Sequence, residues 1–328
     1  MIIGTHNGSF HADETMACAI ISYLYENSQV IRSRDPDELE KADLIIDVSG
    51  INDSRHFDHH SPAFNLSRDN GIRYATAGLM WEKFGLEFLK KIVSREFSEP
   101  VSQEVLKKAL LRIDTEVMSM IDLDDNGQLT EYVQDIINPQ TPDEYRIVNK
   151  LNEFYQNSPA IPYIVAMSNL PGLVQEEQDK AFMNTVKILK GILVNASINA
   201  INTETGIAKV VESYQGGELL IMHEKLPWTQ AVFANMELFC NCLLAVYPDR
   251  EMRWRVQSLP LSKGQRFVNR LSAPKEWRGL NDEALDKVTG LKNLNFIHRS
   301  GFTGGASTFE DDLDLAKLWL KLGERAQK

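Results

Sequence analysis

The first half of the chain alternates short apolar runs with longer amphipathic segments. The apolar runs have the length of buried strands and predict strands at Met1–Thr5, Val30–Arg34, Leu44–Val48 and Arg55–Asp58. Apolar residues at helical spacing predict helices at Glu14–Asn27, Thr76–Lys91, Gln103–Ile121 and Pro142–Gln156. Strands that alternate with helices are typical of a mostly parallel sheet that helices cover on both faces.

The second half begins with a helical pattern over residues 174–202, which we expect to link two domains. Five strand-like runs follow: Ile207–Tyr214, Leu219–His223, Cys240–Tyr247, Met252–Leu259 and Leu294–Ile297. Pro248-Asp249 supplies a turn that favours an antiparallel hairpin between the third and fourth runs. A last helix is predicted at Ser307–Glu324. We therefore predict a two-domain α/β fold, with a mostly parallel sheet flanked by helices in residues 1–170 and a mixed or antiparallel sheet in a smaller domain, residues 171–328.

Composition narrows the class of protein. The chain has 328 residues, of which 43% are hydrophobic and 25% charged, an ordinary balance for a globular protein. Its net charge of −11 argues against a protein that coats duplex DNA or RNA, because such binding depends on neutralising phosphates. Three cysteines are too few for a disulfide framework. Without a long apolar stretch or a leader pattern, we expect a cytoplasmic protein with no membrane partner; the sequence leaves a homo-oligomer open.

The charge is unevenly distributed along the chain. Residues 250–299 carry eleven Lys and Arg against five Asp and Glu, so the rest of the chain is strongly acidic. The basic stretch also contains the aromatic residues Trp254, Phe267, Trp277 and Phe296. Cations mixed with aromatic rings are what single-stranded nucleic acids bind, although a solvated charged face is the simpler alternative. The net charge therefore does not exclude an enzyme that acts on the end of a strand.

Histidine and aspartate residues gather at the predicted strand ends. Five of the seven histidines lie in the first 60 residues: His6, His11, His56, His59 and His60. Ligands of open α/β sheets bind outside the carboxyl ends of the strands, so these segments should converge. Imidazole and carboxylate together suit Mn²⁺, Mg²⁺, Fe²⁺ or Zn²⁺, and the supply is sufficient for two ions that share a carboxylate and activate a water. The alternative is a set of unrelated surface and capping residues.

A further acidic segment, Asp122-Leu-Asp-Asp-Asn-Gly127, follows the helix predicted to end near Ile121. Its first six positions are similar to an EF-hand calcium loop, but position twelve, which must be a bidentate Glu, is Val133. A calcium loop is therefore excluded. The segment is either a simple helix-terminal turn or a source of one more ligand for the metal site.

Three motifs together resemble the DHH phosphoesterase superfamily. They are Thr5-His-Asn-Gly-Ser-Phe-His-Ala-Asp-Glu14, Leu44-Ile-Ile-Asp47 and Phe57-Asp-His-His60. Later motifs narrow the resemblance to the melanocyte proliferating gene product family of 3′–5′ RNA exonucleases: Leu226-Pro-Trp228, Tyr247-Pro-Asp249, Trp254-Arg-Val-Gln257, Trp277-Arg-Gly-Leu280 and His298-Arg-Ser-Gly-Phe-Thr-Gly-Gly305. The resemblance covers nearly the whole chain.

The resemblance implies a role for each matching residue. Asp47 would bridge two metals, Asp58 would orient the Asp-His-His motif, and His60 would face the substrate phosphate. The complete set of implied metal ligands is His6, His11, Asp13, Asp47, His59 and Asp125, with Asp122 as the alternative to Asp125. His11 stands where many superfamily members have Asp, which leaves the metal preference open.

The glycine-rich segment after His298 resembles the superfamily's substrate-clamping loop. The resemblance implies that His298, Arg299, Gly301, Gly304 and Gly305 contact substrate, with backbone N–H groups approaching a phosphate closely. A strand-to-helix turn that simply requires glycine is the alternative.

These features predict a metal-dependent phosphodiester hydrolase. The function we favour is a 3′–5′ exonuclease on single-stranded RNA, with two divalent ions, Mn²⁺ first and Mg²⁺ or another divalent ion as alternatives, and with substrate between the domains. A small-molecule phosphoesterase acting on pyrophosphate, a nucleotide or a dinucleotide is the second hypothesis. A non-catalytic metal-binding regulatory module is the third.

Overall fold

The computed structural model describes residues 1–156, 160–249, 251 and 253–326. Arg250 of the basic stretch and Met252, where one strand was expected to begin, lie outside the described residues. The chain divides into two compact units, unit 1 (Met1–Ile201) and unit 2 (Asn202–Lys328). The boundary between them falls inside the long helix α9, Gln175–Ser213.

Unit 1 contains a four-stranded sheet in the order β2-β1-β3-β4. Its strands are β1 (Ile2–Thr5), β2 (Gln29–Arg32), β3 (Leu44–Ile46) and β4 (His56–Phe57). All three strand pairs are parallel, as the alternation of strands and helices predicts. The carboxyl ends of the four strands therefore lie along one edge of the sheet, although the individual strands are short.

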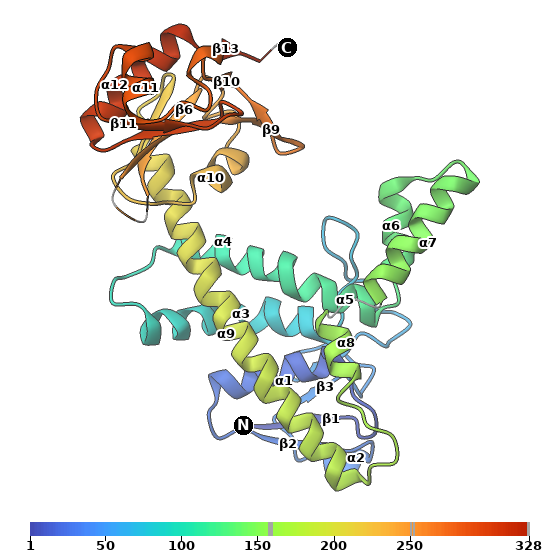
Figure 1. Cartoon of the computed structure of the whole chain (residues 1–328). Helices are drawn as coiled ribbons and strands as arrows, with labels where there is room; N and C mark the ends of the chain where they lie inside the picture. The colour runs from blue at the N-terminus through green and yellow to red at the C-terminus, as the bar shows by residue number, and fades with distance from the viewer. Residues whose placement is uncertain (157–159, 250, 252, 327–328) are drawn as a thin grey trace. The chain divides into compact units, whose positions relative to one another are not determined.

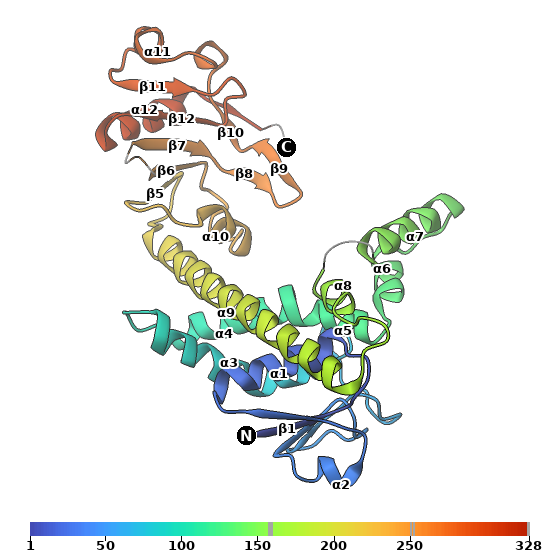
Figure 2. The same cartoon turned by 60° about the horizontal axis from the view of Figure 1, so that its bottom comes forward.

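Helices cover both faces of this sheet. The short α2 (Pro36–Leu39) packs against one face, where Leu39 and Ala42 lie so close to Gly4 that a Cβ there would stand 2.9 Å from Leu39. The largely buried α1 (Ala12–Leu24) lies on the other face (Figure 2). The remaining helices are α3 (Thr76–Glu96), α4 (Gln103–Ile113), a π-helical turn (Asp114–Met118), α5 (Ser119–Asp125), α6 (Leu129–Ile137), α7 (Pro142–Gln156) and α8 (Ile161–Ala166) (Figure 1).

Unit 2 is built on a five-stranded mixed sheet in the order β11-β12-β7-β6-β5. The strands are β5 (Leu219–Ile221), β6 (Leu244–Pro248), β7 (Trp254–Ser258), β11 (Leu294–Ile297) and β12 (Thr303–Ala306). Only β5 and β6 pair in parallel, and β6 with β7 forms the expected antiparallel pair. This arrangement confirms the predicted α/β class with a mixed second sheet.

Two apolar clusters hold the sheet of unit 2. One contains Val246, Val256, Leu315 and Trp319, and joins the sheet to α12 (Phe309–Leu322) and α11 (Asp282–Thr289). The other joins it to α10 (Trp228–Ala234) and the end of α9. Two small sheets, β8 (Pro260–Ser262) with β9 (Gln265–Asn269) and β10 (Leu271–Ser272) with β13 (Glu324–Arg325), complete the unit, with a 3₁₀ turn at Lys275–Trp277.

The strand predicted at Ile207–Tyr214 is wrong, because residues up to Ser213 continue α9. The β-branched residues of this run suggested a strand. However, Ile207, Val210 and Val211 are spaced three and four apart, and on a helix they meet the apolar cluster around Trp228. Tertiary packing here overrides a local preference for strand.

Among the described residues, every helix is either too short or too polar to cross a membrane.

Candidate metal centre

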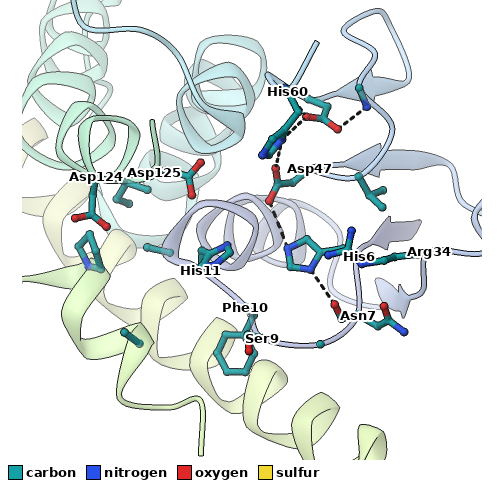
Figure 3. Close-up of a pocket in the computed structure, with 18 residues that line it drawn as sticks. His6, Asn7, Ser9, Phe10, His11, Arg34, Asp47, His60, Asp124 and Asp125 are labelled. Atoms are coloured by element: carbon teal, nitrogen blue, oxygen red, sulfur yellow. Dashed lines mark hydrogen bonds and ion pairs between the residues drawn. The ribbon is translucent and has the colours of Figure 1, made fainter. Parts of the chain in front are cut away.

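The carboxyl edge of the unit 1 sheet opens into a cavity of about 940 Å³. A polar residue follows each of the four parallel strands here: His6 after β1, Arg34 after β2, Asp47 after β3 and Asp58 after β4. Figure 3 shows Asp47 between His6 and His60, with a dashed line to each. The expected convergence of the strand ends is therefore present in the fold.

Asp47 occupies the centre of this cluster. Its Oδ2 lies 3.5 Å from Nε2 of His6, and its Oδ1 lies 3.3 Å from Nδ1 of His60 and 3.7 Å from Nε2 of His59. The residue is buried and has a φ of +54°, a conformation that Asp adopts more readily than most side chains. This sharp turn directly after β3 directs the two carboxylate oxygens toward different histidines.

His6 is held by a residue that the sequence analysis did not assign. Nε2 of His6 lies 3.1 Å from Oε1 of the fully buried Glu14, and its Nδ1 lies 3.1 Å from the carbonyl oxygen of Asn7. Glu14 also accepts a hydrogen bond from the backbone N–H of His11 at 2.9 Å. His11 is the N-cap of α1, and Glu14 is the third residue of the helix, the usual position of a capping-box Glu. Here the same carboxylate also contacts His6 of the cluster.

The Asp-His-His motif is organised by its aspartate. Oδ1 of Asp58 accepts hydrogen bonds from the backbone N–H of His60 and lies 2.9 Å from its Nδ1. Oδ2 accepts from the backbone N–H of Gly50 at 2.7 Å. These contacts fix the loop after β4 and hold the largely exposed His60 ring at the cavity.

Asp13, His59 and Asp125 form a second group of potential ligands. Nε2 of His59 lies 3.1 Å from Oδ2 of Asp125, at the end of α5. The two oxygens of Asp13 accept hydrogen bonds from the first backbone N–H groups of α3, at 2.9 Å from Thr76 and 2.5 Å from Ala77. The N-terminus of α3 therefore holds Asp13 at full burial beside the cavity.

Asp122, the alternative to Asp125, is engaged elsewhere. Its Oδ2 lies 2.7 Å from Nη1 of Arg68, and its Oδ1 accepts from the backbone N–H of Gly78 at 3.1 Å. A Cβ at Gly78 would stand 2.0 Å from Asp122, so the glycine makes room for this carboxylate. The acidic segment is thus a helix end in which Asp122 joins helices and Asp125 faces His59.

The electrostatics of the cluster indicate an excess of negative charge. Burial alone would lower the pKa of His6, but Asp47 and Glu14 raise it to about 10. Burial opposes ionisation of Asp47, yet contacts with His6 and His60 hold its pKa well below the usual range. The pKa of Asp13 is raised by burial and by the nearby charges of Asp125 and Asp47. Such a site favours bound cations.

The donors fit divalent metal ions. Three overlapping groups each place their ligand atoms within 4.8 Å of one another: His6, His11, Glu14 and Asp47; Asp47, Asp58, His59 and His60; Asp13, His59 and Asp125. Asp47 belongs to two of these groups, and His59 also belongs to two. All six expected ligands are included, with Glu14, Asp58 and His60 in addition. Nitrogen and carboxylate oxygen donors in this mixture suit Mn²⁺, Fe²⁺ or Zn²⁺ and, with waters, Mg²⁺.

The loop between His6 and His11 is braced by side chains far away in sequence. The amide of Asn169, after α8, accepts from the backbone N–H of Phe10 at 2.8 Å and donates to its carbonyl oxygen at 2.7 Å. Arg32 on β2 donates to the carbonyl oxygen of Gly8 at 2.6 Å and pairs with Asp179 of α9 at 2.9 Å. No local sequence signal marks Asn169 or Arg32, because both act on backbone atoms of a distant loop.

Arg34 is also absent from the predicted set, and it is the one Lys or Arg among the described residues that line the cavity. It is exposed and follows β2, which ends beside β1. Figure 3 places it on the same side of the cavity as His6.

The glycine-rich segment of unit 2 differs from the expected substrate-binding loop. Gly304 and Gly305 are buried in the strand β12, paired on one side with β11 and on the other with β7. Their backbone groups lie in the plane of the sheet between two strands, so they do not form a phosphate-binding loop. A Cβ at Gly304 would stand 2.3 Å from Ile297, and one at Gly305 would stand 2.5 Å from the carbonyl oxygen of Trp254. Close packing therefore explains both glycines.

The rest of the segment is a tight turn between β11 and β12. Gly301 has a φ of +70°, which favours glycine, and a Cβ there would stand 2.6 Å from Arg278. His298 and Arg299 are exposed, and Nδ1 of His298 lies 2.8 Å from the hydroxyl of Ser300. These two side chains remain accessible, in contrast to the three glycines.

Comparison with known proteins identifies the family. The model of the family MYG1_exonuc, described as "Uncharacterised protein family (UPF0160)", matches residues 2–320. The chain is 30% identical to the MYG1 exonuclease of Rattus norvegicus over 337 residues, covering 97% of this chain and 84% of the rat protein. It is 28% identical to a MYG1 protein of Schizosaccharomyces pombe over 332 residues, covering 96% of both proteins.

Two solved structures align over 98% of this chain. The pGpG-specific phosphodiesterase PggH of Vibrio cholerae has 13% identity, a TM-score of 0.23 and 98% of its own chain covered. RecJ of Thermus thermophilus in complex with Mn²⁺ has 14% identity, a TM-score of 0.24 and 52% of its chain covered. TM-scores this low do not establish a common fold, whereas the family match extends over nearly the whole chain. The chain belongs to the MYG1 family.

Proposed function

We propose that this protein is a metal-dependent phosphodiester hydrolase that removes nucleotides from the 3′ end of single-stranded RNA. The names of its rat, mouse and human relatives, each a MYG1 exonuclease, support a hydrolytic nuclease or phosphoesterase. The RNA substrate, the 3′ polarity and the use of two ions rest on the family resemblance of the sequence motifs.

The convergence of three donor groups on one cavity carries the proposal. Donors reach this cavity from the ends of β1, β3 and β4, from the start of α1 and from the end of α5, so elements far apart in the sequence contribute to it. Asp47, shared by two groups, is suited to bridge two ions, and His59 links the second group to the third.

Each residue of the candidate site then has a role. His6, His11, Asp13, Asp47, His59 and Asp125 would hold the ions, with Glu14 beside His6 as a further donor. Bound divalent ions supply a water of lowered pKa and offset charge on the phosphate. Asp58 holds His60 through its Nδ1, which leaves the Nε2 atom of His60 to contact a substrate phosphate. Arg34 adds the positive charge of its guanidinium to the same cavity.

Replacement of Asp47 tests the metal assignment. Asp47→Ala should abolish Mn²⁺-dependent hydrolysis, because it removes the carboxylate common to two donor groups, while circular dichroism and the elution volume stay unchanged. Asp69→Ala, which removes an exposed carboxylate from a loop of the same unit, is the matched control and should keep full activity. Full activity of Asp47→Ala would show that the metal centre is misassigned.

A substrate panel tests the reaction itself. RNA labelled at its 5′ end should yield a ladder of labelled fragments that shorten with time, whereas RNA labelled at its 3′ end should release a labelled mononucleotide at once. Pyrophosphate and dinucleotides, compared at equal concentration, test the small-molecule hypothesis. Hydrolysis of pyrophosphate without any trimming of RNA would contradict the exonuclease proposal, and metal binding without any hydrolysis would indicate a regulatory module.

A further inference from the structure

The β8–β9 ribbon of unit 2, residues 260–269, is a two-stranded antiparallel hairpin whose second strand is almost entirely exposed. Its turn is Lys263-Gly264. Phe267 is 99% exposed, so its ring makes almost no contact with the protein. Figure 1 shows β9 at the margin of unit 2. A bare aromatic ring on a short ribbon gains nothing for the stability of the fold, since no apolar area is buried.

The base of this ribbon is firmly attached. Arg270, which follows β9 directly, is buried and donates to the carbonyl oxygen of Pro260 at 3.1 Å. Its Nη1 also donates to the carbonyl oxygens of Cys242, at 2.8 Å, and Phe239. One guanidinium thus joins both ends of the ribbon to the body of unit 2. The exposed ring therefore extends from a fixed support and not from a frayed loop.

The charge of the ribbon is uniform in sign. Residues 260–270 contain Lys263, Arg266 and Arg270 and no Asp or Glu, in a chain of net charge −11. Lys263 and Arg266 are exposed, and in the described part of the chain neither forms an ion pair. Arg266 lies over the ring of Phe233, at 5.6 Å, on the neighbouring α10. Two exposed cations without an ion-pair partner among the described residues thus lie on the same ribbon as the bare ring.

The other aromatic residues of the basic stretch are occupied in packing. Trp277 is buried in the core, Trp254 packs against Phe309, and Phe296 lies beneath the guanidinium of Arg255 at 4.6 Å. Phe267 is the only one of these four rings that is fully exposed. The mixture of cations and aromatic residues in the sequence therefore reduces to one accessible ring and its two cationic neighbours.

We propose that the β8–β9 ribbon binds single-stranded nucleic acid, with a base stacked on Phe267 and the adjoining phosphates close to Lys263 and Arg266. This inference rests on the proposed exonuclease function and specifies part of its substrate, a strand longer than a dinucleotide. Base stacking on an aromatic ring is tolerant of sequence and contributes about 1–3 kcal/mol per base. An apolar protein partner fits less well, because the only other exposed large apolar side chain of the ribbon is Val268.

The test is a binding measurement on the full chain in EDTA, so that no hydrolysis intervenes. Fluorescently labelled single-stranded RNA of about 4–16 nucleotides is the probe. Phe267→Leu keeps an apolar side chain but removes the aromatic face, and should weaken binding about 5- to 160-fold, which corresponds to the free energy of one stacked base. Phe267→Trp should bind as tightly as the unchanged protein or more tightly. Val268→Ala, on the opposite face of the same strand, is the matched control and should bind normally.

A second readout separates this inference from the proposed function. Hydrolysis of a dinucleotide in Mn²⁺ should be the same in Phe267→Leu and the unchanged protein, because the ribbon is not part of the metal centre. Equal RNA affinity of Phe267→Leu and the unchanged protein would overturn the inference even if the enzyme is an exonuclease. RNA binding that depends on Phe267, without hydrolysis of any phosphodiester, would support the inference and contradict the proposed function. A concentration-dependent dimer that Phe267→Leu abolishes would identify the ribbon as an interface between copies and overturn the proposal.

Discussion

The metal centre of unit 1 contains a buried carboxylate, Asp47, and the β11–β12 region of unit 2 packs against another, Asp312. Their pKa values are shifted in opposite directions. Asp47 contacts His6 and His60, which hold its pKa low despite burial. Asp312 on α12 is completely buried, and burial raises its pKa to about 8, although the backbone N–H of Ala306 and the charge of Arg255 oppose this. A carboxylate buried among imidazoles stays charged and can bind a cation. A carboxyl group buried without such partners keeps its proton and offers no charge to a cation.

Backbone conformation differs in the same way between the two regions. In unit 1 the chain leaves the sheet at the end of each parallel strand, so side chains there are free to converge on a ligand. In unit 2, Gly304 and Gly305 lie within the central strand β12, whose backbone groups pair with β11 on one side and with β7 on the other. Substitutions in both units test this difference.

Gly305→Ala should destabilise unit 2 by about 1–3 kcal/mol, because the new methyl group would press on the carbonyl oxygen of Trp254. Thermal unfolding followed by tryptophan fluorescence is a suitable measurement, since four of the five tryptophans belong to unit 2. Gly264→Ala, where nothing lies within 4 Å of the added Cβ, is the control and should leave the transition in place. If Gly305→Ala left the unfolding transition unchanged but weakened substrate binding, Gly305 would belong to a substrate-binding loop after all.

Asn169→Ala should weaken Mn²⁺ binding about tenfold, because it removes both hydrogen bonds that hold Phe10 between His6 and His11. Isothermal titration with Mn²⁺ measures this without reference to activity. Ser168→Ala, the neighbouring position, should bind Mn²⁺ normally. Equal Mn²⁺ affinity in the Asn169 variant would mean that the loop keeps its shape without the amide.

Asp312→Asn should raise the thermal midpoint by a few degrees at pH 8 and have little effect near pH 4. In the folded protein Asp312 keeps its proton up to a pKa of about 8, whereas an unfolded chain releases it near its ordinary value. Folding therefore becomes less favourable as pH rises between these two values, and asparagine removes this dependence. Melting curves of both proteins across that range give the difference. A difference independent of pH would indicate that Asp312 is ionised in the fold.

Local patterns predicted much of unit 1 because its chemistry coincides with its strand ends. His6, Asp47 and the Asp58-His59-His60 motif each follow a short apolar run, and the polarity change marks the end of the strand. Glu14 was placed only as the start of a helix, because capping alone accounts for a Glu at that position. Its contact with His6 depends on how α1 meets β1, which no local pattern specifies.

The remaining differences arise where one residue type serves two purposes. The resemblance favoured Asp125 over Asp122 as the ligand but left Asp122 as the alternative. The ion pair that engages Asp122 depends on the three-dimensional position of Arg68, on a loop more than fifty residues earlier. Ile207–Tyr214 has the composition of a strand, yet its apolar spacing also fits the helix that it forms. In both cases the sequence permits two structures, and packing against distant residues selects one.

Hydrophobic periodicity and ordered motifs are local properties of the chain, so they were enough to predict the α/β class, the parallel strands of unit 1 and the family. The folded structure was needed to show which carboxylates face the metal cavity, that Gly304 and Gly305 pack inside a sheet, and that Phe267 is the fully exposed aromatic ring of the basic stretch. This is because the burial and the electrostatic surroundings of a side chain depend on its neighbours in space. Residues far apart along the chain create that neighbourhood, and their side chains meet only after the sheet has formed.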